Sequence, residues 1–192
     1  MINSSNLKST ISITKTKDPI RWYVMRDLKR SNTKLPAYKM LGNMGFEVFT
    51  PMVWKLISQN NKRIPIEVPF MQDLLFVHSS REKLDPVVEQ TGTLQYRYLR
   101  DGKRTPMIVN DMDMERFKRA VEATDNHYFY TPKEVRPEMI GKKVRIVGGP
   151  LDGYEGYLQK LQGSRVKRLL IKLSNLLTAA VEVQPEFVQI VK

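Results

Sequence analysis

The chain has 192 residues, of which 41% are hydrophobic, so it is long enough for one medium domain or two small ones. Its formal net charge of +12 is spread along the whole chain, which favours a polyanionic partner or an assembly that contains one. The sequence has no cysteine, which excludes a disulfide scaffold, a thiolate metal site and a cysteine nucleophile. No stretch has the apolar length of a secretory signal or a membrane helix, so we expect a cytoplasmic protein.

The first 125 residues predict a flexible tail followed by one domain. Residues 1–20 are rich in Ser, Thr, Asn and Lys and lack an apolar period, which is typical of a tail. Residues 21–125 then alternate strand and helix patterns, which predict an α/β sandwich with helices packed on an antiparallel sheet. The expected elements are strands at 21–26, 46–49, 62–68, 74–77, 94–99 and 105–109, and helices at about 33–44, 80–90 and from 111 onward.

Capping and turn residues set the expected boundaries of these elements. Asn32-Thr33 and Asp111 are expected to cap the first and last helices, with Pro36 in the first helical turn and Gly45 at that helix's end. Asp101-Gly102 predicts a two-residue hairpin.

Residues 126–138 carry two prolines and no hydrophobic period, which indicates a linker. From there, residues 139–192 show short alternating strands with glycine turns, which predict a small β-barrel as a second domain. The fold class expected from the whole pattern is therefore α+β.

No catalytic constellation is visible in the sequence. His78 and His127 have no metal-binding spacing, and Asp111, Asp113 and Glu115 match the acidic first turn of a helix. No glycine-rich loop opens a helix, so a phosphate cradle is not expected. We therefore expect no enzyme, no catalytic residue, no metal and no cofactor.

The second domain carries the most specific local motif. Val144 and Ile146 are expected inside and Arg145 outside, Gly149-Pro150 turns the chain, and Gly156 permits a close backbone approach. The whole pattern consists of Val144, Arg145, Ile146, Gly149, Pro150, Gly153 and Gly156. It resembles the KOW motif, which occurs in NusG-type transcription factors and in some ribosomal proteins.

The first domain distinguishes between these two groups. Residues 21–24, 45–52 and 69–77 resemble the NusG N-terminal (NGN) domain, so an NGN domain followed by a KOW domain covers nearly the whole chain. Residues 94–98 and 112–117 look like the UpxY-type paralogues, which act as antiterminators in capsular polysaccharide operons of gut anaerobes.

The resemblance implies a transcription elongation or antitermination factor that suppresses pausing or termination. Family members dock the NGN domain on the clamp helices of the largest catalytic RNA polymerase subunit, through a hydrophobic depression. By position, Tyr23, Met71, Leu74 and Phe76 match this depression, although Leu74 replaces the family's usual aromatic residue. The alternative for each of these residues is an ordinary place in the core.

Four basic residues crowd the expected hairpin: Arg97, Arg100, Lys103 and Arg104. They are expected either to contact phosphates of the non-template or upstream DNA, or to form a solvated tip.

Two other functions remain open from the sequence. The chain could be a housekeeping NusG, which couples polymerase to Rho or the ribosome. It could also be a ribosome-associated RNA-binding protein that uses its KOW domain. The two-domain pattern favours a NusG-type function, with Rho or a ribosomal protein as the expected KOW partner.

Residues 166–181 satisfy two periods at once. Leu169, Ile171 and Leu173 alternate as in a strand, yet the segment also forms an apolar stripe at helical spacing. A helical C-terminal domain that covers the docking depression would resemble RfaH-type paralogues. Fold switching is rare, so we favour the strand interpretation.

Overall fold

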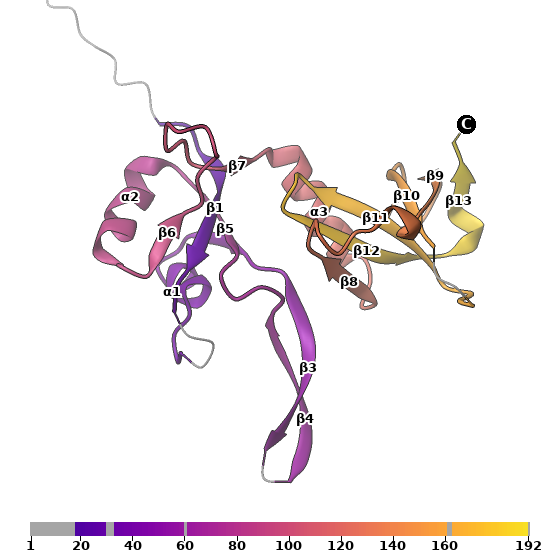
Figure 1. Cartoon of the computed structure of the whole chain (residues 1–192), viewed down its shortest axis with the longest axis horizontal. Helices are drawn as coiled ribbons and strands as arrows, with labels where there is room; N and C mark the ends of the chain where they lie inside the picture. Colours follow the sequence, from indigo (N-terminus) through magenta and orange to yellow (C-terminus); the bar gives the residue numbers. More distant parts are fainter. Residues whose placement is uncertain (1–17, 30–32, 60, 161–162, 192) are drawn as a thin grey trace, which may run out of the picture.

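The computed structural model describes residues 18–29, 33–59, 61–160 and 163–191. Most of the expected N-terminal tail, and Asn32 of the expected helix cap, lie outside these residues. The described chain forms two β-sheets with one helix, α3, between them, and a long hairpin projects from the N-terminal sheet (Figure 1). This arrangement confirms the expected α+β fold class, with an α/β part followed by an antiparallel β part.

The N-terminal sheet is antiparallel and has the order β2-β5-β1-β6. Its strands are β1 (Arg21–Asp27), β2 (Glu47–Phe49), β5 (Leu75–Ser79), β6 (Leu94–Tyr96) and β7 (Ile108–Val109). As expected of a continuous apolar run, β5 is central, between β2 and β1. Strands β6 and β7 both pair with β1, one after the other along the same edge.

Helices cover both faces of this sheet. Helices α1 (Ala37–Asn43) and α2 (Arg81–Gln90) pack on the face that carries Tyr23, Met25, Leu75 and Val77. Helix α3 (Asp111–Glu122) packs on the opposite face, which carries Trp22, Val24, Leu74 and Phe76. The alternation of side chains along a strand explains why neighbouring residues belong to different clusters.

The helix caps differ from those expected, because residues distant in sequence supply some of them. The Oδ2 atom of Asp27 accepts the amide N–H of Ala37 at 2.6 Å, and Pro36 is the extended residue before α1 rather than part of its first turn. An Asp18 carboxylate oxygen accepts the first two amide groups of α2. Gly45 ends the first helix with a φ of 84°, as predicted.

At α3 the expected cap is displaced by one residue. The side chain of Asn110 accepts the amide N–H of Met112 at 2.9 Å, so Asn110 is the N-cap and Asp111 is already helical. An Asn side chain reaches the same orphan donors as an Asp side chain would, and Asp111 then favours the helix dipole from the first turn.

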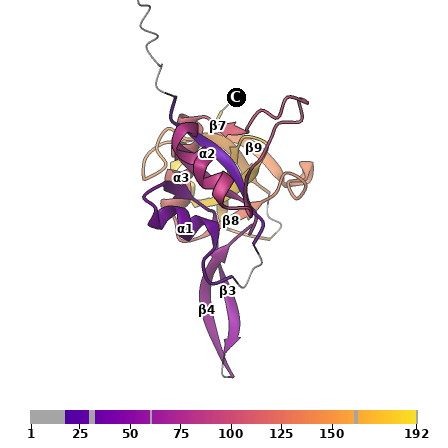
Figure 2. The ribbon, with the colours of Figure 1, turned by 90° about the vertical axis from the view of Figure 1, so that its left-hand side faces the viewer.

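Strand β3 (Met52–Gln59) pairs with β4 (Lys62–Pro69) as a separate two-stranded ribbon. Figures 1 and 2 show it projecting from the body of the protein. The sequence predicted a strand at 62–68 and did not predict β3. Pro65 and Pro69 of β4 fit this ribbon, because no third strand of the described chain pairs with it and would need their missing N–H groups.

The prediction that the strands on either side of Asp101-Gly102 pair with each other through a two-residue turn is wrong. The strands on either side pair with β1, and residues 97–107 form a longer loop closed by a bridge between Tyr98 and Pro106. The amide of Leu99 also donates to the carbonyl of Thr105 at 2.9 Å. The Asp-Gly pair turns the chain, but β1 offers the longer pairing edge.

The C-terminal sheet has six antiparallel strands in the order β13-β9-β10-β11-β12-β8. Its strands are β8 (His127–Tyr130), β9 (Ile140–Ile146), β10 (Glu155–Gln159), β11 (Lys167–Leu173), β12 (Leu177–Val183) and β13 (Val188–Ile190), with 3₁₀ turns η1 (Pro137–Met139) and η2 (Pro185–Phe187). No pairing joins the two end strands in the described parts of the chain, so the sheet stays open where a closed barrel was expected.

Strand β8 lies inside the segment expected as a linker, and this part of the expectation is wrong. It pairs with β12 through four residue pairs, from Thr178 with Tyr130 to Val181 with His127. Its short length and adjacent proline gave no sequence period. Burial of Phe129 between the two halves of the molecule provides the packing that stabilises the strand.

Residues 166–181 adopt the strand interpretation. Strands β11 and β12 form a regular hairpin with seven residue pairs, from Lys167 with Val183 to Leu173 with Leu177. The apolar stripe at helical spacing is therefore sheet core in this structure.

Candidate functional site

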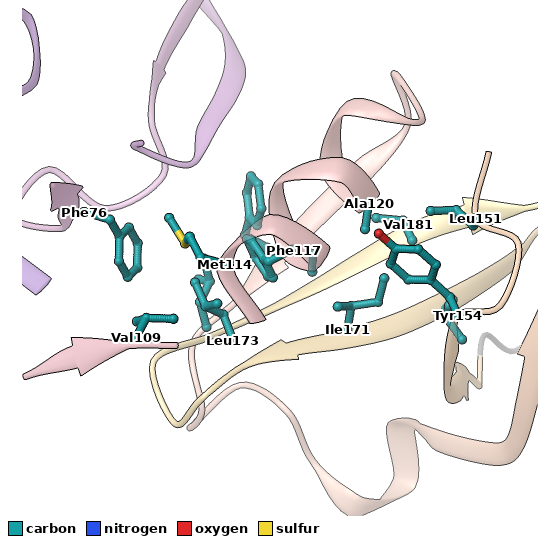
Figure 3. Packing of buried hydrophobic residues seen from close by; sticks show 14 of the residues in the cluster. Phe76, Val109, Met114, Phe117, Ala120, Leu151, Tyr154, Ile171, Leu173 and Val181 are labelled. Carbon is teal, nitrogen blue, oxygen red and sulfur yellow. The ribbon is translucent and has the colours of Figure 1, made fainter. Parts of the chain in front are cut away.

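Helix α3 lies between the two sheets, and its apolar side chains contact both. Met114, Phe117 and Ala120 are fully buried in one cluster that includes residues from each sheet. Figure 3 shows Phe76 on one side of the helix and Ile171 and Tyr154 on the other. The hydrophobic core is thus continuous from the N-terminal sheet to the C-terminal sheet.

Three of the four residues expected at a docking depression lie together on the α3 side of the N-terminal sheet. Leu74 and Phe76 are 1% and 0% exposed, and Met71 is partly buried against the same cluster. In this conformation they belong to the core between the two halves of the molecule. The structure therefore shows the core interpretation for Leu74 and Phe76, and the docking surface stays a prediction.

Tyr23 does not join them. Its side chain packs on the opposite face with α1 and α2, and its ring lies edge-on to Tyr96 at 5.5 Å. Burial, with a further effect from the Asp18 carboxylate, raises the pKa of Tyr23. The expectation that Tyr23 lies beside the other three is wrong, because adjacent strand positions face opposite ways.

Five phenylalanines connect the N-terminal sheet to β8. Phe49 lies 6.0 Å from Phe76 and 6.2 Å from Phe117, measured between ring centroids. Phe129 of β8 stacks on Phe117 at 6.2 Å and lies 5.6 Å from Phe70, which follows β4. Sequence reasoning missed this row, since no local period connects residues that lie 60 or so positions apart.

Polar contacts attach one side of α3 to the N-terminal sheet. The Lys118 ammonium donates to Glu47 at 2.9 Å and lies 5.0 Å from the Trp22 ring centroid. His78 stacks on Trp22 at 4.8 Å, and its Nδ1 lies 2.8 Å from the same Glu47 carboxylate. Burial opposes ionisation of Glu47, but hydrogen bonds from Lys118 and His78 outweigh it and lower the pKa of Glu47.

Different contacts attach α3 to the C-terminal sheet. The Arg116 guanidinium donates to the carbonyl oxygen of Glu155 at 2.6 Å and lies 4.9 Å from the Tyr154 ring centroid. The Tyr154 hydroxyl donates to the carbonyl oxygen of Arg116 at 3.0 Å. Burial raises the pKa of Tyr154, so this hydroxyl stays a donor.

The four basic residues of the loop at 97–104 divide into two roles. Arg97 is partly buried and pairs with Asp73 at 3.0 Å, so its charge is compensated inside the protein. Arg100, Lys103 and Arg104 are exposed, and they form no ion pair with the described residues. Arg104 has a φ of 53°, which fixes the turn at the end of the loop.

The KOW-like motif has the predicted geometry. Val144 and Ile146 are buried, and Arg145 is exposed and pairs with Glu155 at 2.9 Å. A Cβ on Gly156 would lie 2.7 Å from the carbonyl oxygen of Leu170, which explains the glycine. The turn is formed by Gly149, Pro150 and Gly153, of which the two glycines have positive φ values.

Within the described ranges, no group of three His, Cys, Asp or Glu side chains could hold a metal ion. No described helix has the length and apolar character needed to cross a membrane.

Comparisons with known proteins identify the family of this chain. The family model described as transcription termination factor nusG matches residues 20–118. No curated protein matches the chain. Among solved structures, the one titled "Domain interaction in Thermotoga maritima NusG" is 14% identical, covers 91% of this chain and 98% of that chain, and has a TM-score of 0.46. Because the family model covers just over half of the sequence, the chain belongs to the NusG family, whose members are transcription factors and not enzymes.

Proposed function

We propose that this protein is an operon-specific elongation and antitermination factor, and that it docks on the clamp helices of the largest catalytic RNA polymerase subunit through a patch that contains Met71 and is supported from beneath by Leu74 and Phe76. The observation that carries this proposal is that the C-terminal sheet packs over α3 and Met71, on the side of the N-terminal sheet that carries Phe76. The aromatic row from Phe76 ends on Phe129, which belongs to the C-terminal sheet. A surface covered by a separate domain can be offered to a partner when that domain moves.

The contact between the C-terminal sheet and the N-terminal unit is of a kind that a partner could replace. Removing the C-terminal sheet would expose Phe70, Met71 and the outer side of α3, which together form an apolar patch of the kind that marks interfaces. The polar contacts found across this boundary centre on Arg116, with Glu155 and Tyr154. Relative motion of domains is the ordinary expectation for contacts of limited extent.

The docking face is tested by changing Met71→Glu in the full chain. A carboxylate placed at an apolar interface without a partner is costly, so we expect binding to core RNA polymerase to fall by at least about tenfold. Met112→Glu is the matched control, because Met112 is 78% exposed on α3. Pull-down with purified polymerase measures both. Equal polymerase binding by Met71→Glu and the parent chain would overturn this docking face.

We propose that Arg100, Lys103 and Arg104 contact phosphates of the non-template or upstream DNA once the protein is on polymerase. Their exposure supports this role, whereas Arg97 positions the loop through Asp73. Reversing the charges of Arg100 and Arg104 should weaken suppression of pausing more than polymerase affinity. Lys83→Glu on α2 is the control. If charge reversal weakened the suppression of pausing equally at low and at moderate salt, the result would contradict a phosphate contact.

Operon specificity is supported by the segments 94–98 and 112–117, which resemble UpxY-type antiterminators. A housekeeping NusG would instead couple polymerase to Rho or the ribosome. A pull-down from native cytoplasm, scored for polymerase, Rho and ribosomal proteins, separates these functions. Polymerase without Rho supports the specialised role, whereas stoichiometric Rho supports the housekeeping one and ribosomal proteins alone support an RNA-binding ribosomal role.

A further inference from the structure

A groove of about 650 Å³ opens at one end of the C-terminal sheet, between η1, the last residues of β10 and the start of β11. Strand β10 begins beside α3, where Glu155 accepts from Arg116, and the groove lies at its other end. In Figure 1 this end of β9 and β10 lies away from the N-terminal sheet. The groove therefore stays open while the C-terminal sheet covers the N-terminal face.

The charge around this groove is strongly one-sided. Its basic side chains are all exposed, and Glu138 is its one carboxylate. None of the basic groups forms an ion pair with the described residues, whereas the neighbouring Lys143 and Arg145 both pair with Glu155, at 3.8 and 2.9 Å. The basic residues of the groove are Arg136, Lys142, Lys160 and Lys167.

Apolar side chains and backbone complete the groove. Met139, Leu158 and Val166 contribute apolar surface to its lining. A Cβ on Gly141 would lie 2.7 Å from the carbonyl oxygen of Leu158, so the close approach of β9 and β10 depends on that glycine. The register of the two strands shifts between Tyr157 and Gln159, as in a β-bulge. These backbone features fix the shape of the groove independently of any ligand.

We propose that this groove binds the sugar-phosphate backbone of a nucleic-acid strand. Four uncompensated cations along an open groove match a ligand with repeated negative charge better than a single small anion. Three of them are lysines, which bind phosphate as point charges, and the fourth is an arginine, whose planar fork matches phosphate geometry. The apolar lining can take the faces of sugars or bases. This site is separate from the polymerase-docking face and goes beyond the proposed function.

The test measures fluorescence anisotropy of a labelled, roughly 12-nucleotide single strand with the full-length protein, using RNA and DNA of the same sequence. The variant Lys142→Glu with Lys160→Glu should bind at least about tenfold more weakly. Affinity falls as salt rises, and each lost phosphate contact makes the slope of log affinity against log salt concentration shallower by about 0.7. The double variant should therefore have a slope shallower by about 1.4.

Two further variants keep the result free of folding effects. Lys172→Glu reverses an exposed lysine on β11 that does not line the groove, and its affinity should stay within about twofold of the parent. Glu138→Gln removes the groove's carboxylate and should tighten binding, a gain that misfolding cannot produce. The variants are compared in a background with Arg100→Gln and Arg104→Gln, so that loop contacts do not contribute.

Binding of both RNA and DNA would show recognition of the phosphate backbone alone, and binding of RNA alone would add recognition of the ribose hydroxyl. Either result supports the groove if the reversal variant loses affinity and Glu138→Gln gains it. Unchanged affinity in the reversal variant, or an equal loss in Lys172→Glu, would overturn it. Polymerase pull-down with the same variants should be unaffected, so failure here is distinguishable from failure of the docking face.

Discussion

The two faces of the N-terminal sheet are covered by different parts of the chain. On one face, Tyr23, Met25, Leu75 and Val77 lie under α1 and α2, which belong to the same α/β unit as the strands. On the other face, α3 lies over Leu74 and Phe76, and β11 and β12 pack behind it. The first face is closed entirely by its own unit and has a structural role. On the second, the C-terminal sheet covers α3 with Phe70 and Met71, and this part can be uncovered without unfolding the unit.

The largest effect is expected from Leu84→Ala on the first face. Leu84 is the fully buried residue of α2 and packs on this face, so truncation leaves a cavity and should lower the free energy of unfolding by about 3 kcal/mol. Chemical denaturation followed by circular dichroism measures this loss. A loss well below about 1 kcal/mol would mean that α2 is not a permanent part of the unit.

Phe129→Ala should separate the two halves of the molecule while the N-terminal unit stays folded. It removes the ring that stacks on Phe117 and meets Phe70, at 6.2 and 5.6 Å. We expect polymerase affinity to rise several-fold, because the docking face becomes free more often. Surface plasmon resonance on immobilised polymerase gives the affinity. An unchanged or lower affinity, with circular dichroism unchanged, would contradict the shielding of this face.

Arg116→Ala should have a smaller effect in the same direction. The change removes the hydrogen bond to the Glu155 carbonyl and the contact with the Tyr154 ring, while the Lys118 contacts with the N-terminal sheet remain. Hydrogen exchange should show faster exchange at β8, whose Phe129 packs on Phe117 and Phe70 across the boundary, and little change at α1. Arg119→Ala, three residues further along the helix, is the control, and it should leave both rates unchanged.

The smallest effect concerns pH and Glu47. Its folded-state pKa is lowered, so its contribution to stability is complete above the ordinary glutamate pKa and is lost as the pH falls through the folded value. The parent chain should therefore be more stable than Glu47→Gln at pH 7, and the difference in Tm should shrink toward pH 3. Glu122→Gln, at the exposed end of α3, should show no such convergence.

The sequence predicted what local patterns control. Strand β1 follows from its aromatic and β-branched residues, the central strand β5 from its continuous apolar run, and the KOW-like turn from glycine placement. Helices were expected at α1, α2 and α3, and all three are present. The sequence did not predict β3, because this strand is stabilised by β4 alone and exposes Trp54 and Leu56 instead of burying one face.

The remaining misses involve contacts between distant residues. Strand β8 depends on pairing with β12, some 50 positions away, and the cap of α1 comes from Asp27 rather than from the adjacent segment. The candidate site shows both limits. Their positions in the family pattern predicted that Met71, Leu74 and Phe76 lie together. The side of the sheet on which Tyr23 lies, and the row of phenylalanines, depend on tertiary packing that the pattern does not contain.

The most direct measurement of the central claim uses a reversible tether between the halves. The chain has no cysteine, so Phe70→Cys with Phe129→Cys places one unique pair at the contact between the β4–β5 turn and β8. A short, cleavable bis-maleimide linker joins the two thiols, and polymerase binding is measured before and after cleavage. The tethered protein should fail to bind polymerase and should recover binding on cleavage. Equal binding in both states would contradict the claim that the C-terminal sheet covers the docking face.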